Sequence, residues 1–124
     1  MNYPNELLYS KSHEWVKYED DLAVIGITDY AQDSLGDIVF INLPSEEDEL
    51  EKGEAFSDIE SVKAVSDVIS PVTGIVKEIN EELLDSPEKI NENPYEAWLV
   101  KVAEITGHED LMSAAEYEAF IEKQ

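Results

Sequence analysis

The stretch Ser57-Asp58-Ile59-Glu60-Ser61-Val62-Lys63-Ala64-Val65-Ser66-Asp67 decides how this chain folds. It lies within a run from Ala55 to Ser70 that contains neither glycine nor proline. Such an apolar-rich run favours β structure, but strands are typically only about 5–6 residues long, so we expect one break inside it. The polar residues Ser61 and Lys63 mark the best place for that break. The run therefore predicts a hairpin with Lys63 at or near its tip.

Lys63 is the only basic residue between Lys52 and Lys77, so one primary amine stands alone on an acidic arm. Exposure to solvent is the rule for lysine, and an ordinary solvated hairpin lysine is the simplest interpretation of its spacing. The neighbouring motifs, and not the spacing, have to decide whether this amine has a function.

The length of 124 residues predicts one domain over residues 1–124, large enough for a modest core. We expect that core over about residues 7–105 and a C-terminal helix over about residues 110–123. Hydrophobic residues make up 43% of the chain, which is typical of a globular protein and excludes a disordered one.

The charge balance is strongly acidic, with 8 Lys and Arg against 30 Asp and Glu and a formal net charge of −22. Such a chain repels phosphate backbones and anionic lipids, so we expect neither nucleic acid nor membrane as a partner. No apolar run of about 18 residues and no signal-peptide pattern is present, which favours a cytoplasmic protein. A leader removed earlier would leave no trace in this sequence. The acidity suits either solubility or docking to basic partner surfaces.

The side chains offer little reactive chemistry of their own. The chain has no Cys, and its two histidines, His13 and His108, lie far apart in the sequence. No metal-ligand spacing, phosphate-binding loop or nucleophile elbow is present. If this protein takes part in a reaction, the reactive group is therefore added to it.

Hydrophobic patterning and turn signals predict the remaining elements. Thr28 or Asp29 and Gly36 are suitable caps for a short helix between them. Strands are expected over residues 14–18, 22–27, 37–43 and 75–80, and residues 94–102 begin in a turn and become a strand. Loops or turns are expected over residues 19–21, 45–51, 71–74 and 81–93, the last with a helical turn near Pro87, and a break over residues 106–108.

Several motifs in this order resemble the glycine cleavage system H proteins. Around the hairpin they are Glu60-Ser61-Val62-Lys63-Ala64, Ser66-Asp67 and Ser70-Pro71-Val72-Thr73-Gly74. Elsewhere they are Ser12-His13-Glu14-Trp15-Val16, Gly26-Ile27-Thr28-Asp29-Tyr30-Ala31-Gln32 and the segment 91–102. Ser57 and Ala97 depart from the pattern, because these proteins often carry Gly at both positions. The resemblance runs from about Leu7 to the C-terminal helix.

The resemblance implies a mainly β fold of the barrel-sandwich hybrid type, like lipoyl and biotinyl domains, with short helices and a C-terminal amphipathic helix. It implies that Lys63 carries lipoate in an amide bond to its side-chain nitrogen. Glu60 and Ala64 then belong to the surface that the lipoylating enzyme reads, whether that is a lipoate ligase or an octanoyl or lipoyl transferase.

The implied function is a shuttle in glycine catabolism and one-carbon metabolism, not an enzyme. The arm takes an aminomethyl group from a pyridoxal-phosphate glycine decarboxylase and delivers it to a tetrahydrofolate-dependent aminomethyltransferase. A lipoamide dehydrogenase then reoxidises the dithiol. Proteins of this family fold the loaded arm against their own surface, and the matching positions are Ser12, Glu14 and Asp67. Glu14 and Asp67 could equally be ordinary solvated acids.

Three alternatives remain open at this stage. A lipoyl domain of a 2-oxoacid dehydrogenase or a biotin carrier typically has Asp-Lys-Ala or Met-Lys-Met where this chain has Val62-Lys63-Ala64, and is usually shorter and tethered by linkers. A lipoyl or octanoyl relay to other complexes would use the same lysine. An unmodified acidic binding module would carry no adduct on Lys63.

Overall fold

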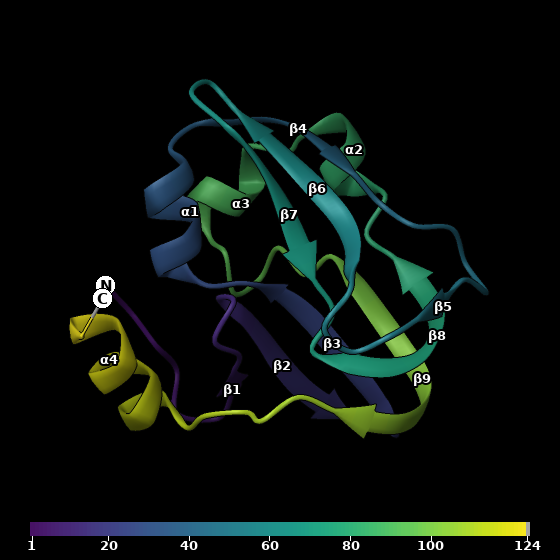
Figure 1. The fold of residues 1–124 in the computed structure, drawn as a ribbon. Helices are drawn as coiled ribbons and strands as arrows, with labels where there is room; N and C mark the ends of the chain where they lie inside the picture. The colour runs from purple at the N-terminus through teal and green to yellow at the C-terminus, as the bar shows by residue number, and fades with distance from the viewer. Residues whose placement is uncertain (124) are drawn as a thin grey trace.

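The computed structural model describes residues 1–123 as two antiparallel β-sheets with short helices around them (Figure 1). The larger sheet has the strand order β1-β2-β3-β9-β8-β5, and the smaller has the order β4-β6-β7. Neither order closes into a barrel within the described residues. The strands are β1 Leu8–Tyr9, β2 Glu14–Glu19, β3 Leu22–Ile27, β4 Ile38–Asn42, β5 Glu49–Leu50, β6 Ala55–Ser61, β7 Val65–Ile69, β8 Val72–Ile79 and β9 Val100–His108.

The described residues form four helices, α1 Asp29–Leu35, α2 Glu82–Asp85, α3 Lys89–Glu92 and α4 Ala114–Glu122. The predicted mainly β fold with short helices and a C-terminal helix is thereby confirmed. None of these helices has the length and apolar character needed to cross a bilayer. The predicted domain extends to residue 124, which lies outside the described part of the chain.

Helix α1 begins and ends where its capping residues predict. The Thr28 side chain accepts a hydrogen bond from the backbone N–H of Ala31 at 3.2 Å, which satisfies a free donor of the first turn. Gly36 ends the helix with φ +80°. The chain then enters β4, which lies beside β6 of the hairpin. The caps of α1 therefore position the strand that supports the Lys63 arm.

The main core lies between the two sheets. Ile25 and Val100 come from the larger sheet and Ile41 and Ile59 from the smaller, and all four are buried in one cluster. Removing this apolar surface from water is the main driving force that joins the sheets. A second cluster fastens α4, because Tyr117 stacks on Tyr9 of β1 with ring centroids 4.8 Å apart.

The prediction of a turn over residues 71–74 is wrong, because strand β8 already begins at Val72. Gly74 lies inside that strand, at a register irregularity between Thr73 and Ile75. A Cβ on Gly74 would lie 2.6 Å from the carbonyl oxygen of Ala103, so β9 approaches too closely for any side chain. The glycine therefore serves close strand packing and not a turn.

The predicted break over residues 106–108 is also wrong, because β9 continues through His108 and pairs with the start of β8. At its N-terminal end, β9 begins only at Val100, near the end of the predicted segment 94–102. Residues 94–96 form a turn, closed by the Ala97 N–H donating to the Asn93 carbonyl at 3.0 Å, and residues 97–99 lead from it to Val100.

The two predicted loops contain short regular elements. Within residues 45–51, β5 pairs with β8 and buries Leu50. Within residues 81–93, α2 and α3 flank Pro87 and are held by the buried Leu83 and Ile90. Neither helix has a side-chain cap, so the sequence carried no capping signal for them. The C-terminal helix starts only at Ala114, because residues 110–112 are extended and Met112 pairs with Tyr9.

Candidate functional site

The hairpin of β6 and β7 turns at Val62 and Lys63, as predicted, and Lys63 is exposed there. Ser61 organises the turn. Its hydroxyl accepts the N–H groups of Lys63 at 3.3 Å and Ala64 at 3.1 Å, and its own N–H donates to the Ala64 carbonyl at 2.8 Å. A serine hydroxyl that binds nearby backbone groups is a favoured turn element. The amine therefore projects from a turn with a defined conformation.

The tip is fastened to the connection between α1 and β4. The Val62 N–H donates to the Asp37 carbonyl at 3.0 Å. Asn91 of α3 binds that connection with its side-chain amide. The amide NH2 group donates to the Gly36 carbonyl at 2.9 Å and to the Gln32 side-chain oxygen at 3.0 Å. The amide oxygen accepts the Ile38 N–H at 2.8 Å. One half-buried side chain thus links α1, α3 and β4 beneath the Lys63 turn.

The Lys63 side chain lies along the C-terminal end of α1. A Cβ built on Gly36 would lie 3.4 Å from Lys63 Cε and 3.9 Å from its Nζ. Helix C-termini carry partial negative charge, so this is a favourable place for an ammonium group. Because Lys63 remains exposed, a visiting enzyme can reach the amine from solvent.

Glu60 and Ala64, the residues predicted to be read by a lipoylating enzyme, are both exposed beside Lys63. Glu60 pairs with Phe40 on one side and Val65 on the other. Directly paired residues point to the same face of a sheet, so the Glu60 carboxylate lies between two apolar side chains on the outer face.

Glu14 is not an ordinary solvated acid, because only 2% of its surface is exposed. One carboxyl oxygen accepts the hydroxyls of Ser10, at 2.7 Å, and Ser12. The other accepts the backbone N–H of Ile69 in β7 at 3.3 Å. Burial raises the pKa of Glu14 to about 7, although these hydrogen bonds oppose the shift. This carboxyl therefore changes protonation near neutral pH.

The structure brings Ser12 and Glu14 together but sets Asp67 apart. Asp67 is exposed on β7 and pairs with Asp58, whose carboxylate accepts the Asn42 amide at 2.7 Å. Within residues 1–123, no hydrogen bond joins Asp67 to Ser12 or Glu14. Asp67 is nevertheless only two residues from Ile69, whose backbone N–H donates to Glu14.

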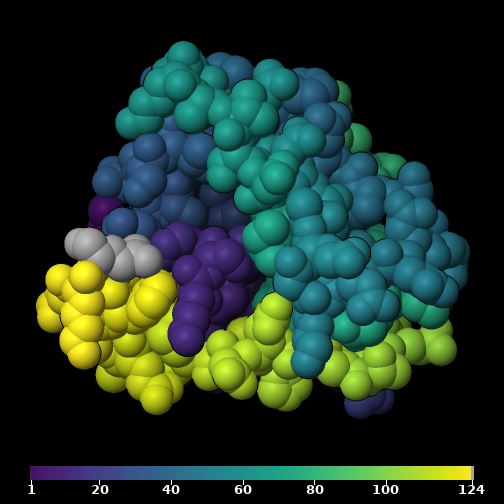
Figure 2. Space-filling view, viewed as in Figure 1, coloured from purple at the N-terminus to yellow at the C-terminus, as the bar shows by residue number. Residues whose placement is uncertain are grey.

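The surface is hollowed between the teal hairpin and the N-terminal part of the chain (Figure 2). Beside Ser12, a cavity of about 380 Å³ is lined by Ser10, Lys11, Ser12, Glu109 and Asp110. The two serines that donate to Glu14 therefore also face an open cavity.

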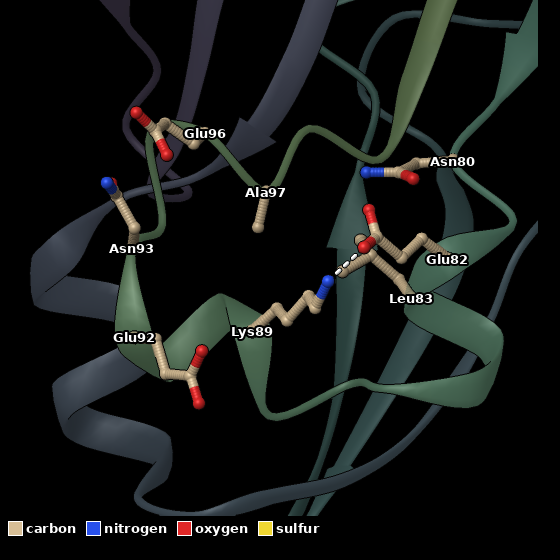
Figure 3. A pocket seen from close by; sticks show the side chains of 8 residues that line it. All are labelled: Asn80, Glu82, Leu83, Lys89, Glu92, Asn93, Glu96 and Ala97. Carbon is tan, nitrogen blue, oxygen red and sulfur yellow. Dashed lines mark hydrogen bonds and ion pairs between the residues drawn. The ribbon is translucent and has the colours of Figure 1, made fainter.

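A separate cavity of about 280 Å³ lies between α2, α3 and the chain before β9 (Figure 3). Lys89 reaches across it to an ion pair with Glu82, and Ala97 points into it. Its lining residues are Asn80, Glu82, Leu83, Lys89, Glu92, Asn93, Glu96 and Ala97. The ammonium in this lining is already paired with a carboxylate, and the cavity gains no functional assignment from its residues.

Sequence reasoning missed three residues of the site. Ser10 could have been found from the alternation Ser10-Lys11-Ser12-His13-Glu14, which presents two hydroxyls near one carboxyl. Gly36 was recognised only as a helix stop, and nothing in the sequence indicated that it lies beneath Lys63. Asn91 was noted only as the start of the segment 91–102, and nothing in the sequence indicated its three hydrogen-bond partners, which are 53 to 59 residues away.

Comparisons with known proteins agree on one family. A family model described as glycine cleavage H-protein matches residues 7–124. The glycine cleavage system H protein of Lachnoclostridium phytofermentans is 58% identical over 125 residues, covering 100% of this chain and 98% of that protein. The one from Staphylococcus carnosus is 56% identical over 124 residues, covering 98% of each.

Among solved structures, the crystal structure of a glycine cleavage system H protein from Mycobacterium marinum superposes with a TM-score of 0.90 at 35% identity. The match covers 94% of this chain and 97% of that one. Sequence and fold thus give the same answer over nearly the whole length. The chain belongs to the glycine cleavage H-protein family, whose members are lipoyl carriers of the glycine cleavage system.

Proposed function

We propose that this chain carries lipoate in an amide bond to Lys63 Nζ and shuttles between the enzymes of glycine cleavage. The observation that carries the proposal is the single primary amine exposed at the tip of a braced hairpin, within Glu60-Ser61-Val62-Lys63-Ala64. When bound, the dithiolane supplies the redox and group-carrying sulfur chemistry that a chain without Cys lacks.

Attachment needs a neutral Lys63 amine. A base on the attaching enzyme takes the proton from the Lys63 ammonium group. The amine nitrogen then attacks the carbonyl of an activated acyl donor, an acyl adenylate or a carrier-bound acyl thioester. The amide C–N bond forms and the bond to the leaving group breaks. Lys63 contributes only the nucleophile, while the braced turn holds its position.

The partners proposed for the loaded carrier are a pyridoxal-phosphate glycine decarboxylase, a tetrahydrofolate-dependent aminomethyltransferase and a lipoamide dehydrogenase. The decarboxylase loads the aminomethyl group, the transferase removes it, and the dehydrogenase restores the oxidised arm. The chain is the carrier and not the catalyst in all three encounters. A formal charge of −22 favours fast, salt-dependent encounters with basic docking surfaces on such enzymes.

Between encounters, we propose that the arm lies along the free edge of β7, with its end near Ser12, Glu14 and Asp67. Asp67 is four positions after Lys63 in the sequence, which corresponds to at most about 13 Å of extended chain. A lysine side chain lengthened by an eight-carbon acyl chain is of comparable length. The Glu14 carboxyl, the Ser12 hydroxyl and the Asp67 carboxylate are groups that can accept hydrogen bonds from an ammonium.

The experiment is an intact-mass measurement after incubation with lipoate, ATP and a purified lipoate ligase. The parent is expected to gain one lipoyl adduct that maps to Lys63, and so is Lys77→Arg, which alters an exposed lysine of β8. Lys63→Arg keeps the positive charge but removes the acceptor, so it should stay folded, unmodified and inactive in glycine-dependent CO2 exchange. An adduct on Lys63→Arg, or CO2 exchange with it, would refute the proposal.

A further inference from the structure

The turn over residues 10–14, which we call the pocket turn, contains a backbone conformation that is uncommon outside glycine. His13, which lies between Ser12 and Glu14, has a φ of +75°. Other residues adopt this left-handed region infrequently, and they keep it where the surrounding contacts hold them in place. The His13 carbonyl accepts the backbone N–H of Thr28 at 3.1 Å. The placement of Ser12 and Glu14 therefore depends on what holds His13.

The His13 ring is held between two helices. Its centroid lies 4.8 Å from that of Tyr30 in α1, and 5.8 Å and 6.2 Å from those of Tyr117 and Phe120 in α4. Helix α4 is the last element of the chain and lies beside the N-terminal segment (Figure 1). The pocket turn is thus packed against an element from the opposite end of the sequence.

One hydroxyl group joins α4 to the pocket turn. The Tyr117 hydroxyl hydrogen-bonds to Nδ1 of His13 at 2.8 Å and to the hydroxyl of Thr28 at 2.7 Å. Tyr117 and Thr28 are fully buried, so water does not compete for the bond between them. Within residues 1–123, no other side chain of α4 hydrogen-bonds beyond the helix and its N-cap. The ring alone accounts for the stacking on Tyr9, so the hydroxyl has a separate role.

We propose that α4 positions the arm pocket, because the Tyr117 hydroxyl holds the His13 ring and so fixes the pocket turn for the loaded arm. This statement rests on the proposed function, in which the end of the arm lies near Ser12 and Glu14. His13 and Tyr117 are positioning residues, since they act on the arm through their neighbours. Without the hydroxyl, the turn opens more often, and the arm is sheltered for a smaller fraction of the time.

Amide hydrogen exchange in the unmodified full-length protein tests whether the hydroxyl holds the turn. In Tyr117→Phe, the amide of Thr28, which donates to the His13 carbonyl, should exchange about fivefold faster, the factor that one lost hydrogen bond corresponds to. Tyr9→Phe is the matched control. It removes another tyrosine hydroxyl of the same aromatic cluster, but that hydroxyl donates to the Pro4 carbonyl at 2.6 Å. Urea unfolding verifies that both variants are folded and measures how much stability each has lost.

Loss of the load from the isolated carrier tests the effect on the arm. Each protein is lipoylated, loaded by a glycine decarboxylase with glycine and separated from that enzyme, and its ammonia release is measured. Tyr117→Phe should lose its load about fivefold faster than the parent, again the factor for one hydrogen bond, and Tyr9→Phe should match the parent. His13→Asn should also lose its load faster, because asparagine tolerates the left-handed conformation but places no ring between the helices.

The double variant Tyr117→Phe/His13→Asn separates positioning from general destabilisation. Since Tyr117 acts on the turn through His13, the double variant should lose its load at nearly the same rate as His13→Asn alone. Multiplied effects in the double variant would overturn the proposal. So would equal Thr28 exchange in Tyr117→Phe and Tyr9→Phe, or a load that Tyr117→Phe keeps as long as the parent.

Failure of the proposed function gives a different result. A parent without an adduct on Lys63 refutes the carrier function, and the proposal for α4 fails with it. A Glu14→Gln/Asp67→Asn carrier that keeps its load as long as the parent refutes the arm pocket in the same way. If that carrier loses its load quickly while Tyr117→Phe does not, the arm pocket stands and only the role of α4 is refuted.

Discussion

The Glu14 carboxyl accepts a hydrogen bond from the backbone N–H of Ile69 at 3.3 Å, which joins the start of β2 to the free edge of β7. Ile69 is near the end of the strand that descends from Lys63. The same carboxyl accepts the hydroxyls of Ser10 and Ser12, so it is fixed on both oxygens. The hairpin is thus tied at its base to the segment that holds the predicted arm pocket.

The buried Glu14 carboxyl predicts a pH dependence of stability. Its pKa in the folded protein, about 7, lies above its ordinary value of 4.5, so the folded state binds the proton more tightly than the unfolded state. The stability contributed by this group is therefore fully present below about pH 4.5 and is lost as pH rises to about 7. Relative to the parent, Glu14→Gln should become more stable between pH 5 and pH 8, by up to about 3 kcal/mol.

Urea unfolding of both proteins at pH 5, 6, 7 and 8 measures this difference. Glu51→Gln is the control, because Glu51 is exposed and its substitution removes the same charge. For each variant, the difference in free energy of unfolding from the parent is compared across these pH values. If this difference changes with pH in the same way for Glu14→Gln and Glu51→Gln, the buried carboxyl does not cause the pH dependence of stability.

The backbone conformation of Gly36 predicts that any side chain at this position, next to Lys63, lowers the stability of the protein. Its φ of +80° with ψ of −156° belongs to a region that essentially only glycine adopts. Gly36→Ala should lower the free energy of unfolding by about 1–3 kcal/mol. Gly107→Ala is the control, because its Cβ would meet no atom closer than 3.9 Å. Equal urea midpoints for the two variants would contradict the conformational argument.

Asn91 predicts that the Lys63 turn is braced from α3. Asn91→Ala leaves the Ile38 N–H and the Gly36 carbonyl without their side-chain partner, at a cost of about 1–3 kcal/mol. Amide hydrogen exchange at Val62 should accelerate, since its acceptor, the Asp37 carbonyl, lies in the same connection. Asn93→Ala, one residue beyond the same helix and exposed, should leave that exchange rate unchanged. An unchanged hydrogen-exchange rate at Val62 in Asn91→Ala would show that Asn91 does not stabilise the Lys63 turn.

The arm pocket predicts how long the carrier keeps its load. If Glu14 and Asp67 shelter the aminomethyl group, Glu14→Gln/Asp67→Asn should lose it to solvent faster than the parent, as measured by ammonia and formaldehyde release from the isolated loaded carrier. The single variants separate the buried acid from the exposed one. A double variant that retains its load as long as the parent and Glu51→Gln would end this assignment.

The sequence by itself determined the hairpin and the place of its lysine. A run without glycine or proline is too long for one strand, and Ser61 supplies the hydroxyl that closes the turn at Val62 and Lys63. These are local effects between residues a few positions apart. The caps of α1 at Thr28 and Gly36 were predictable for the same reason.

Only the tertiary structure decided what surrounds the hairpin, because those contacts join segments that are distant in sequence. Gly74 was mistaken for a turn residue because the backbone of β9, which forbids a side chain there, approaches it from 29 residues further along the chain at Ala103. The raised pKa of Glu14 likewise follows from its burial in the folded chain, where even the backbone N–H that reaches its carboxyl group comes from Ile69, 55 residues away. Burial and close approach are properties of the folded chain, and no local pattern encodes them.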